Sequence, residues 1–214
     1  MITPEIFLGI TTYVVLLFSL SVHESAHGYV AYRMGDDTAM LQGRVDLNPL
    51  VHIDPVGTFL IPLLQIFWGG VPLLGWAKPT PVGAHNFRKL ARGHVLVAGA
   101  GPASNLLLAV LFTLALLVIR SAGMAQGPHD VFFVIAAVGI QMNLGLALFN
   151  LVPVPPLDGS WIVSWGLPRP IGERYDRLVE PFGPWLLLLL FIPIGKILVP
   201  IQSWLTLFIF RMVY

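Results

Sequence analysis

Residues 5–34 read EIFLGITTYVVLLFSLSVHESAHGYVAYRM, and this stretch carries both a long apolar run and a cluster of ionisable residues. No proline interrupts it before Gly35-Asp36-Asp37, which ends the helical pattern. A helix rises about 1.5 Å per residue, so Glu5–Met34 is long enough to cross a hydrocarbon core of about 30 Å. We therefore expect one membrane-spanning helix over Glu5–Met34.

The composition of the whole chain also indicates a membrane protein. Of 214 residues, 56% are hydrophobic and 11% are charged, with a mean hydropathy of +0.80; a soluble domain carries about 25% charged residues. The net charge of +1 gives no sign of a nucleic-acid partner. Since the chain has no cysteine, a metal must be held by histidine and carboxylate. The first apolar run lacks a cleavage site of small residues, so we expect it to be retained rather than removed as a signal peptide.

Further apolar stretches follow the first. Val95–Ile119 and Val131–Val152 are long enough for one span each. Pro184–Phe210 contains prolines and a lysine, and it fits either one kinked span or two short ones. We expect an all-α polytopic membrane protein with a single domain over residues 1–214, a core at 5–160 and a C-terminal helical tail at 181–214.

Two stretches between these spans have a different character. Gly43–Pro49 alternates between polar and apolar residues and ends at a proline, which predicts a short strand. Val56–Trp76 is apolar but rich in glycine and proline. Irregular backbone at membrane depth is tolerated where protein covers it, so 56–76 favours a re-entrant segment, with a full crossing as the alternative.

The basic residues predict an orientation. Eight of the twelve lie in residues 35–94 and 154–180, whereas the loop over 121–130 contains none. The positive-inside rule therefore places 35–94 and 154–180 in the cytoplasm, and the 121–130 loop and the N-terminus outside. A full crossing by 56–76 would reverse the later spans, which is why the re-entrant interpretation is favoured.

The first span ends in His23-Glu24-Ser25-Ala26-His27. Two histidines one helical turn apart project from the same face, where both imidazoles can reach one Zn²⁺, and the glutamate can act on a water as general base. The alternative is a set of polar residues at a membrane interface. Ionisable groups on a membrane helix are expensive and mark function by default, so we favour the metal site.

A catalytic zinc site needs a third protein ligand, and Asp158 is the candidate. It follows the third long span directly, after three prolines, and Gly159 lets the backbone turn there. In the predicted topology the first and third spans end on the same side, so Asp158 meets His23 and His27 at one depth. The alternative is a plain Asp-Gly loop turn. We expect His52, Asp54, His85 and His94 to be structural because they lack a ligand spacing.

These residues resemble a known family. His23–His27 together with the distal Asn150 and Leu157-Asp158-Gly159 are similar to the paired signatures of the site-2 protease family of intramembrane metalloproteases, peptidase family M50. Gly101-Pro102-Ala103-Ser104-Asn105 resembles the family's Gly-Pro-x-x-Asn element. Gly43–Pro62 and Trp76–Val82 are similar to its compact bacterial and archaeal branch. The likeness covers about residues 10–160.

The resemblance implies a three-helix catalytic core followed by C-terminal helices. His23, His27 and Asp158 would bind one zinc ion per chain, and Glu24 would be the general base. Asn150 would contact the substrate or an oxyanion, although a helix C-terminal cap explains it equally well. We expect Asn105 to be a helix-packing residue. Many relatives carry a PDZ-like or CBS-like domain that we do not find in this sequence, which leaves regulation open.

The function that follows is a zinc metalloendopeptidase that cuts membrane proteins in or near their transmembrane segments. It would be a multi-pass protein of the cell membrane with its active site toward the cytoplasm, and its partners would be the lipid bilayer and a transmembrane substrate; its oligomeric state stays open. The alternative is a non-catalytic membrane protein that binds or transports metal. Transport predicts ionisable residues in several spans, and Val95–Ile119 and Val131–Phe149 contain none.

Overall fold

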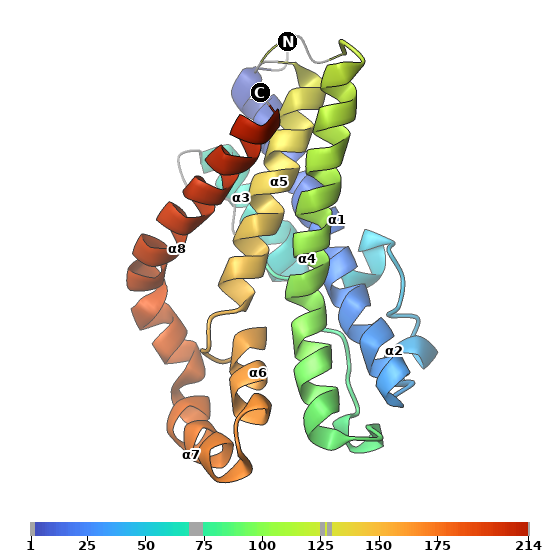
Figure 1. The fold of residues 1–214 in the computed structure, drawn as a ribbon, viewed down its shortest axis with the longest axis vertical. Coiled ribbons are helices and arrows are strands. Elements are labelled where there is room, and N and C mark those ends of the chain that lie inside the picture. The colour runs from blue at the N-terminus through green and yellow to red at the C-terminus, as the bar shows by residue number, and fades with distance from the viewer. Residues whose placement is uncertain (1–2, 69–74, 125–126, 128–129, 214) are drawn as a thin grey trace.

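The fold is a bundle of long helices with shorter ones gathered mainly at one end (Figure 1). The computed structural model describes residues 3–68, 75–124, 127 and 130–213. Four helical stretches are long and apolar enough to cross a membrane, namely Pro4–Met34, Leu90–Ser121, Val131–Asn150 and Arg169–Val213. The predicted all-helical architecture is confirmed at this level.

The first helix, α1 (Pro4–Met34), has the predicted extent. The Thr3 side chain accepts a hydrogen bond from the Ile6 amide, and Pro4 occupies the first turn, where its missing N–H costs nothing. Gly35 ends the helix with φ of 111°, a conformation that favours glycine. The single helix therefore carries the ionisable cluster on its last turns.

Helices α4 (Leu90–Ser121) and α5 (Val131–Asn150) complete the core with α1. Leu116 and Ile140 are fully buried between them. Gly139 brings α5 close to α4, because a Cβ at this position would lie 2.5 Å from ring carbons of Phe112. The second and third long apolar stretches are thus helices, as the sequence predicts, and they pack against each other.

The C-terminal tail forms one helix, α8 (Gly183–Val213), which continues through Pro193 and Pro200. Its last turns pack on the core between α4 and α5 through Leu205, Ile209 and Phe210. The rest of α8 diverges from α5 (Figure 1) and exposes large apolar side chains. Of the two alternatives for Pro184–Phe210, the single kinked stretch is the one observed. Two short helices, α6 (Asp158–Gly166) and α7 (Arg169–Val179), connect it to α5.

The short strand expected at 43–49 is wrong: no strand occurs among the described residues. The chain forms the short helix α2 (Thr38–Leu41), an irregular segment, and a 3-10 turn over Pro49–His52. The Asp46 side chain accepts a hydrogen bond from the Asn48 amide, and Asn48 accepts one from Leu50. These side chains satisfy the local backbone and so compete with strand pairing.

The apolar segment that begins after residue 54 starts and ends at neighbouring points of the structure. A π-helical turn over Pro55–Leu60 leads into α3 (Ile61–Trp68), and residues 69–74 lie outside the described ranges. The Trp76 amide donates to the Gly57 carbonyl at 3.2 Å, and the Lys78 amide donates to the His52 carbonyl at 2.9 Å. The two ends of this segment are therefore neighbours.

Candidate metal centre

His23 and His27 project from α1 into the centre of the bundle. Their relative exposures are 5% and 8%, which is low for imidazoles. The Nε2 atoms of the two rings lie 3.0 Å apart. The helical spacing thus brings two nitrogen atoms to one point, as the sequence predicts.

Asp158 reaches the same point from the segment that follows the C-terminus of α5. Helix α5 ends at Asn150, the proline-containing segment follows, and Asp158 opens α6. Its Oδ2 lies 3.2 Å from His23 Nε2, and its Oδ1 lies 3.4 Å from His27 Nε2. Gly159 allows this approach, since a Cβ there would lie 2.6 Å from the Val152 carbonyl oxygen. Glycine is required at position 159 because the backbone of residues 151–152 lies too close for a side chain, and not because of a positive φ.

The hydrogen bonds behind the imidazoles decide which ring nitrogen is free. His23 Nδ1 donates to Asn105 Oδ1 at 2.6 Å, and Asn105 Nδ2 donates to Asn143 Oδ1 at 2.9 Å. Asn143 Nδ2 in turn donates to Ser19 Oγ at 2.9 Å. His27 Nδ1 donates to the Val97 carbonyl at 2.7 Å. In neutral imidazoles with Nδ1 protonated, both Nε2 lone pairs face inward, which is the arrangement of metal-ligating histidine.

Three electron-pair donors therefore crowd one buried point, and only a cation can relieve their repulsion. Asp158 Oδ2 is buried without a hydrogen-bond donor. Burial by itself raises the pKa of Asp158, whereas a proton on Nε2 of either imidazole would donate a hydrogen bond to the carboxylate and lower this pKa to about 2. The carboxylate is thus ionised, and either protons on the imidazoles or a metal ion must balance it.

The spacing of the three donor atoms fits zinc. Zinc–ligand bonds of about 2.0–2.1 Å in tetrahedral geometry separate the ligand atoms by about 3.3 Å, close to the 3.0, 3.2 and 3.4 Å observed. Within the described part of the chain, His23, His27 and Asp158 are the one group of three His, Asp or Glu side chains close enough to share an ion. Catalytic zinc sites have three protein ligands and one open position, and this group offers three donors.

Gly101 of α4 leaves the space that this site needs. A Cβ at Gly101 would lie 2.5 Å from Nε2 of both His23 and His27. Any side chain there would occupy the point on which the donors converge. The Gly-Pro-x-x-Asn element thus contributes its glycine to the room around the site and its asparagine to the hydrogen bond with His23.

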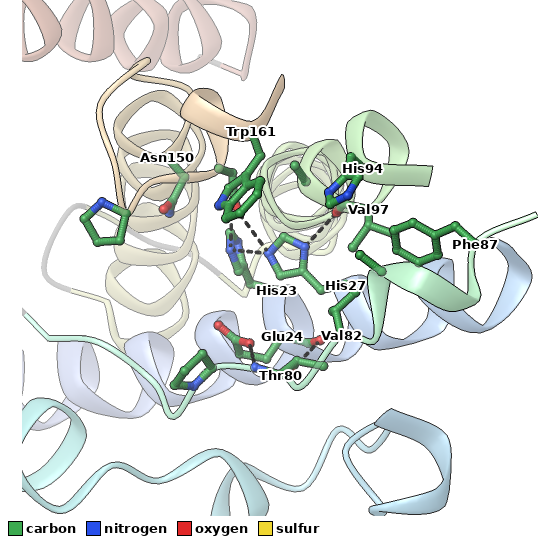
Figure 2. A pocket seen from close by; sticks show the side chains of 15 residues that line it. His23, Glu24, His27, Thr80, Val82, Phe87, His94, Val97, Asn150 and Trp161 are labelled. Atoms are coloured by element: carbon green, nitrogen blue, oxygen red, sulfur yellow. Dashed lines mark hydrogen bonds and ion pairs between the residues drawn. The ribbon is translucent and has the colours of Figure 1, made fainter. Parts of the chain in front are cut away.

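A cavity of about 480 Å³ opens onto the donors (Figure 2). Glu24 lines it, and its Oε2 accepts a hydrogen bond from the Thr80 amide at 2.7 Å. The Thr80 hydroxyl donates to the Glu24 carbonyl oxygen at 3.0 Å. Figure 2 shows Glu24 beside Thr80 on one side of the imidazoles and Trp161 over the other. The extended segment around Thr80 therefore fixes the backbone and carboxylate of Glu24.

Asn150 also lines the cavity, from the last turn of α5. Its Nδ2 donates to the Leu146 carbonyl at 3.0 Å. This contact is local to the last turn of α5, and it leaves the second amide hydrogen for a ligand. A local structural role and a contact with substrate or an oxyanion are therefore both compatible with the position of Asn150.

None of the four rival residues joins the group of three donors. His52 is buried and binds the Asp46 carbonyl through Nε2. Asp54 caps a turn by accepting the amides of Val56 and Gly57. His94 lines the cavity but stacks on Trp165 with ring centroids 4.0 Å apart, and His85 sits in an exposed 3-10 turn.

Sequence reasoning missed two contacts of the site. Asn105 is fully buried, as a packing residue would be, but it also holds His23. An amide inside an apolar span needs a hydrogen-bond partner, and this requirement was the available signal. Thr80 gave no signal, because its contact with Glu24 joins residues far apart in sequence.

Comparison with known proteins places these residues in a family. The chain is 42% identical over 189 residues to "Putative zinc metalloprotease YwhC" of Bacillus subtilis, covering 86% of this chain and 81% of the relative. It is 33% identical over 188 residues to "Putative zinc metalloprotease Rip2" of Mycolicibacterium smegmatis, covering 86% and 67% respectively. No family model and no solved structure matches the chain. Similarity over most of both sequences shows that the chain belongs to the site-2 protease (M50) family of zinc metalloproteases.

Proposed function

We propose that this protein is an intramembrane zinc metalloprotease that hydrolyses peptide bonds in or beside the transmembrane segments of membrane proteins. The observation that carries the proposal is the convergence of His23 Nε2, His27 Nε2 and the Asp158 carboxylate at one buried point. Two of these ligands stand on a helix that is long and apolar enough to cross a membrane. Family membership supports the same conclusion.

His23, His27 and Asp158 would hold the ion, and Asn105 and Val97 would keep the imidazoles in the ligating tautomer. When bound, zinc supplies Lewis-acid chemistry, since it polarises a carbonyl group and acidifies water. One zinc ion per chain matches the single group of ligands found among the described residues.

Glu24 is the candidate general base. Its carboxylate takes a proton from the attacking water and later delivers it to the nitrogen of the leaving amine. The Thr80 amide holds one carboxylate oxygen at 2.7 Å and thereby orients the other. Asn150 is the candidate donor to the substrate carbonyl or to the negative charge that develops on it.

The substrate backbone must be extended to react. A transmembrane helix hides its carbonyl groups in internal hydrogen bonds, so it has to unwind at the site. The cavity of about 480 Å³ has room for an extended segment beside Glu24. Proteins with transmembrane segments are therefore the proposed partners.

The proposed placement is a multi-pass protein of the cell membrane, with the site toward the cytoplasm. The basic residues of 35–94 and 154–180 support this orientation. Hydrogen bonds join the Trp76 and Lys78 amides to the chain near residue 55, which supports a re-entrant segment over 56–76 rather than a crossing. A single membrane-embedded domain over residues 1–214 is part of the same proposal.

The test uses purified protein in proteoliposomes with a labelled single-span substrate. Glu24→Gln should keep one zinc per chain and abolish cleavage, because the amide cannot accept the proton. Asp158→Ala should lower zinc occupancy. Cleavage by Glu24→Gln at the wild-type rate would remove Glu24 as the base, and full zinc occupancy without any cleavage by the wild type would favour a metal-binding protein.

A further inference from the structure

Lys196 of α8 is a charged residue within an apolar helix. It is the one charged residue in the apolar run Pro184–Phe210, and its side chain is exposed. The neighbouring Gly195, with Leu198 and Gln202, lines a cavity that α8 forms with α1 and α5. Successive residues of a helix are about 100° apart, so Lys196 lies on the flank of α8 next to this inner face.

The ammonium group is far from both ends of the apolar run. Trp185 and Phe210 lie about 16 Å and about 21 Å from Lys196 along the helix axis. Lysine side chains reach the interface from positions near helix ends, whereas a charge in the interior of a span is unfavourable unless it is paired. If α8 lies in the bilayer, this charge requires a counter-group.

The chain itself does not supply one. The side-chain ion pairs within the described residues are those of Asp158 with His23 and His27 and that of Arg169 with Glu173. All eleven acidic residues fall in the described ranges, so none is hidden outside them. No carboxylate side chain of the described residues pairs with Lys196, so we look for its counter-group in another molecule.

A second copy of the chain is a poor source. In the long apolar helices the acidic residues are Glu5, at the start of α1, and Glu24, which lies in the candidate site. Helices α4, α5 and α8 contain none. The apolar helices of a second copy therefore offer no accessible carboxylate for Lys196.

The same flank of α8 carries further polar groups. Pro200 has no N–H, so it leaves the Lys196 carbonyl without its usual helical donor. Ser203, two turns beyond Lys196 on the same flank, exposes a hydroxyl. A cation, a carbonyl that lacks its usual helical donor and a hydroxyl thus form one polar stripe in an otherwise apolar helix.

We propose that this stripe is a docking face for a transmembrane helix of a different protein, one that carries an aspartate or glutamate at matching depth. The complementary carboxylate neutralises Lys196, and polar contacts between helices in lipid then hold the pair together. The inference shares with the proposed function the placement of α8 in the bilayer. It does not depend on proteolysis.

The experiment measures energy transfer between labelled full-length protein and a synthetic helix in liposomes of zwitterionic lipid. The probe is a leucine–alanine transmembrane peptide with one central aspartate. Two control peptides carry leucine at that position or the aspartate two turns nearer one end. Wild type should bind the central-aspartate peptide at least about fivefold more tightly than either control.

Two variants locate the effect. Lys196→Met should abolish the preference, and Lys196→Arg should keep it because it retains the charge. Both should load zinc like wild type, since Lys196 lies outside the candidate metal centre. Equal binding of all three peptides by wild type, or an unchanged preference in Lys196→Met, would overturn the proposal. Loss of cleavage in any sample bears on the proposed function alone.

Discussion

Replacing Asn105 by leucine isolates the contribution of the hydrogen bond behind His23. Asn105 is fully buried, its Oδ1 accepts from His23 Nδ1 at 2.6 Å, and its Nδ2 donates to Asn143. Leucine has a similar volume and removes both bonds. His23 then loses the acceptor that fixes its tautomer, and a buried N–H is left unpaired.

The size of the effect follows from these two losses. Removing an outer partner of a metal-ligating histidine lowers metal affinity by about 10- to 100-fold, or about 1.4–2.7 kcal/mol. An unsatisfied buried donor costs about 1–3 kcal/mol, which is the same range. We therefore expect Asn105→Leu to bind zinc about 10- to 100-fold more weakly, measured in detergent by competition with a chromogenic chelator.

Asn105→Asp is the matched control. A carboxylate keeps the acceptor for His23 but loses the donor to Asn143. If the bond to His23 governs metal affinity, the aspartate variant should bind zinc at least as tightly as wild type, since carboxylate–histidine pairs raise ligand basicity. Wild-type affinity in Asn105→Leu, or equal weakening in both variants, would refute the reasoning and leave Asn105 as a packing residue.

Other positions give independent tests. Gly101→Ala should lose zinc, because its Cβ would lie 2.5 Å from both Nε2 atoms, whereas Gly99→Ala on the same helix meets open space and should load normally in the same elemental analysis. Thr80→Val removes the hydroxyl bond to the Glu24 backbone and should slow cleavage about fivefold with zinc retained, while Thr80→Ser restores the rate; equal rates would contradict this. Burial raises the pKa of Asp36, but hydrogen bonds from Thr38, Asn86 and Gly83 outweigh it and lower the pKa. This stabilisation is present above about pH 4 and is lost as pH falls through the lowered pKa. Asp36→Asn should therefore melt below wild type at neutral pH, with the gap closing in acid; a constant gap would exclude this origin.

The sequence predicted the parts of the fold that depend on local pattern. α1 has the expected bounds because Pro4 and Gly35 determine where it begins and ends. Asp158 could be named as a ligand because two spans ending on one side bring their ends to one depth. The distances among His23, His27 and Asp158 agree with that prediction.

The parts that could not be predicted depend on competition between distant or side-chain contacts. The alternating pattern at 43–49 suggested a strand, but Asp46 and Asn48 bind their own backbone instead. Pro193 and Pro200 left open whether the tail was one helix or two, since prolines are tolerated within membrane helices when other groups compensate. The contact of Thr80 with Glu24 is set by the packing of 75–83 on α1, for which one sequence offers no pattern.

The line of hydrogen bonds from Ser19 through Asn143 and Asn105 to His23 joins three helices to one imidazole. An interaction that holds the His23 ring in place also stabilises the contacts among α1, α4 and α5, because the same hydrogen bonds connect them. Metal binding and the packing of the three helices are therefore thermodynamically coupled, so each stabilises the other. If zinc binds as proposed, its removal would therefore loosen the contacts among these three helices as well as free the three ligands.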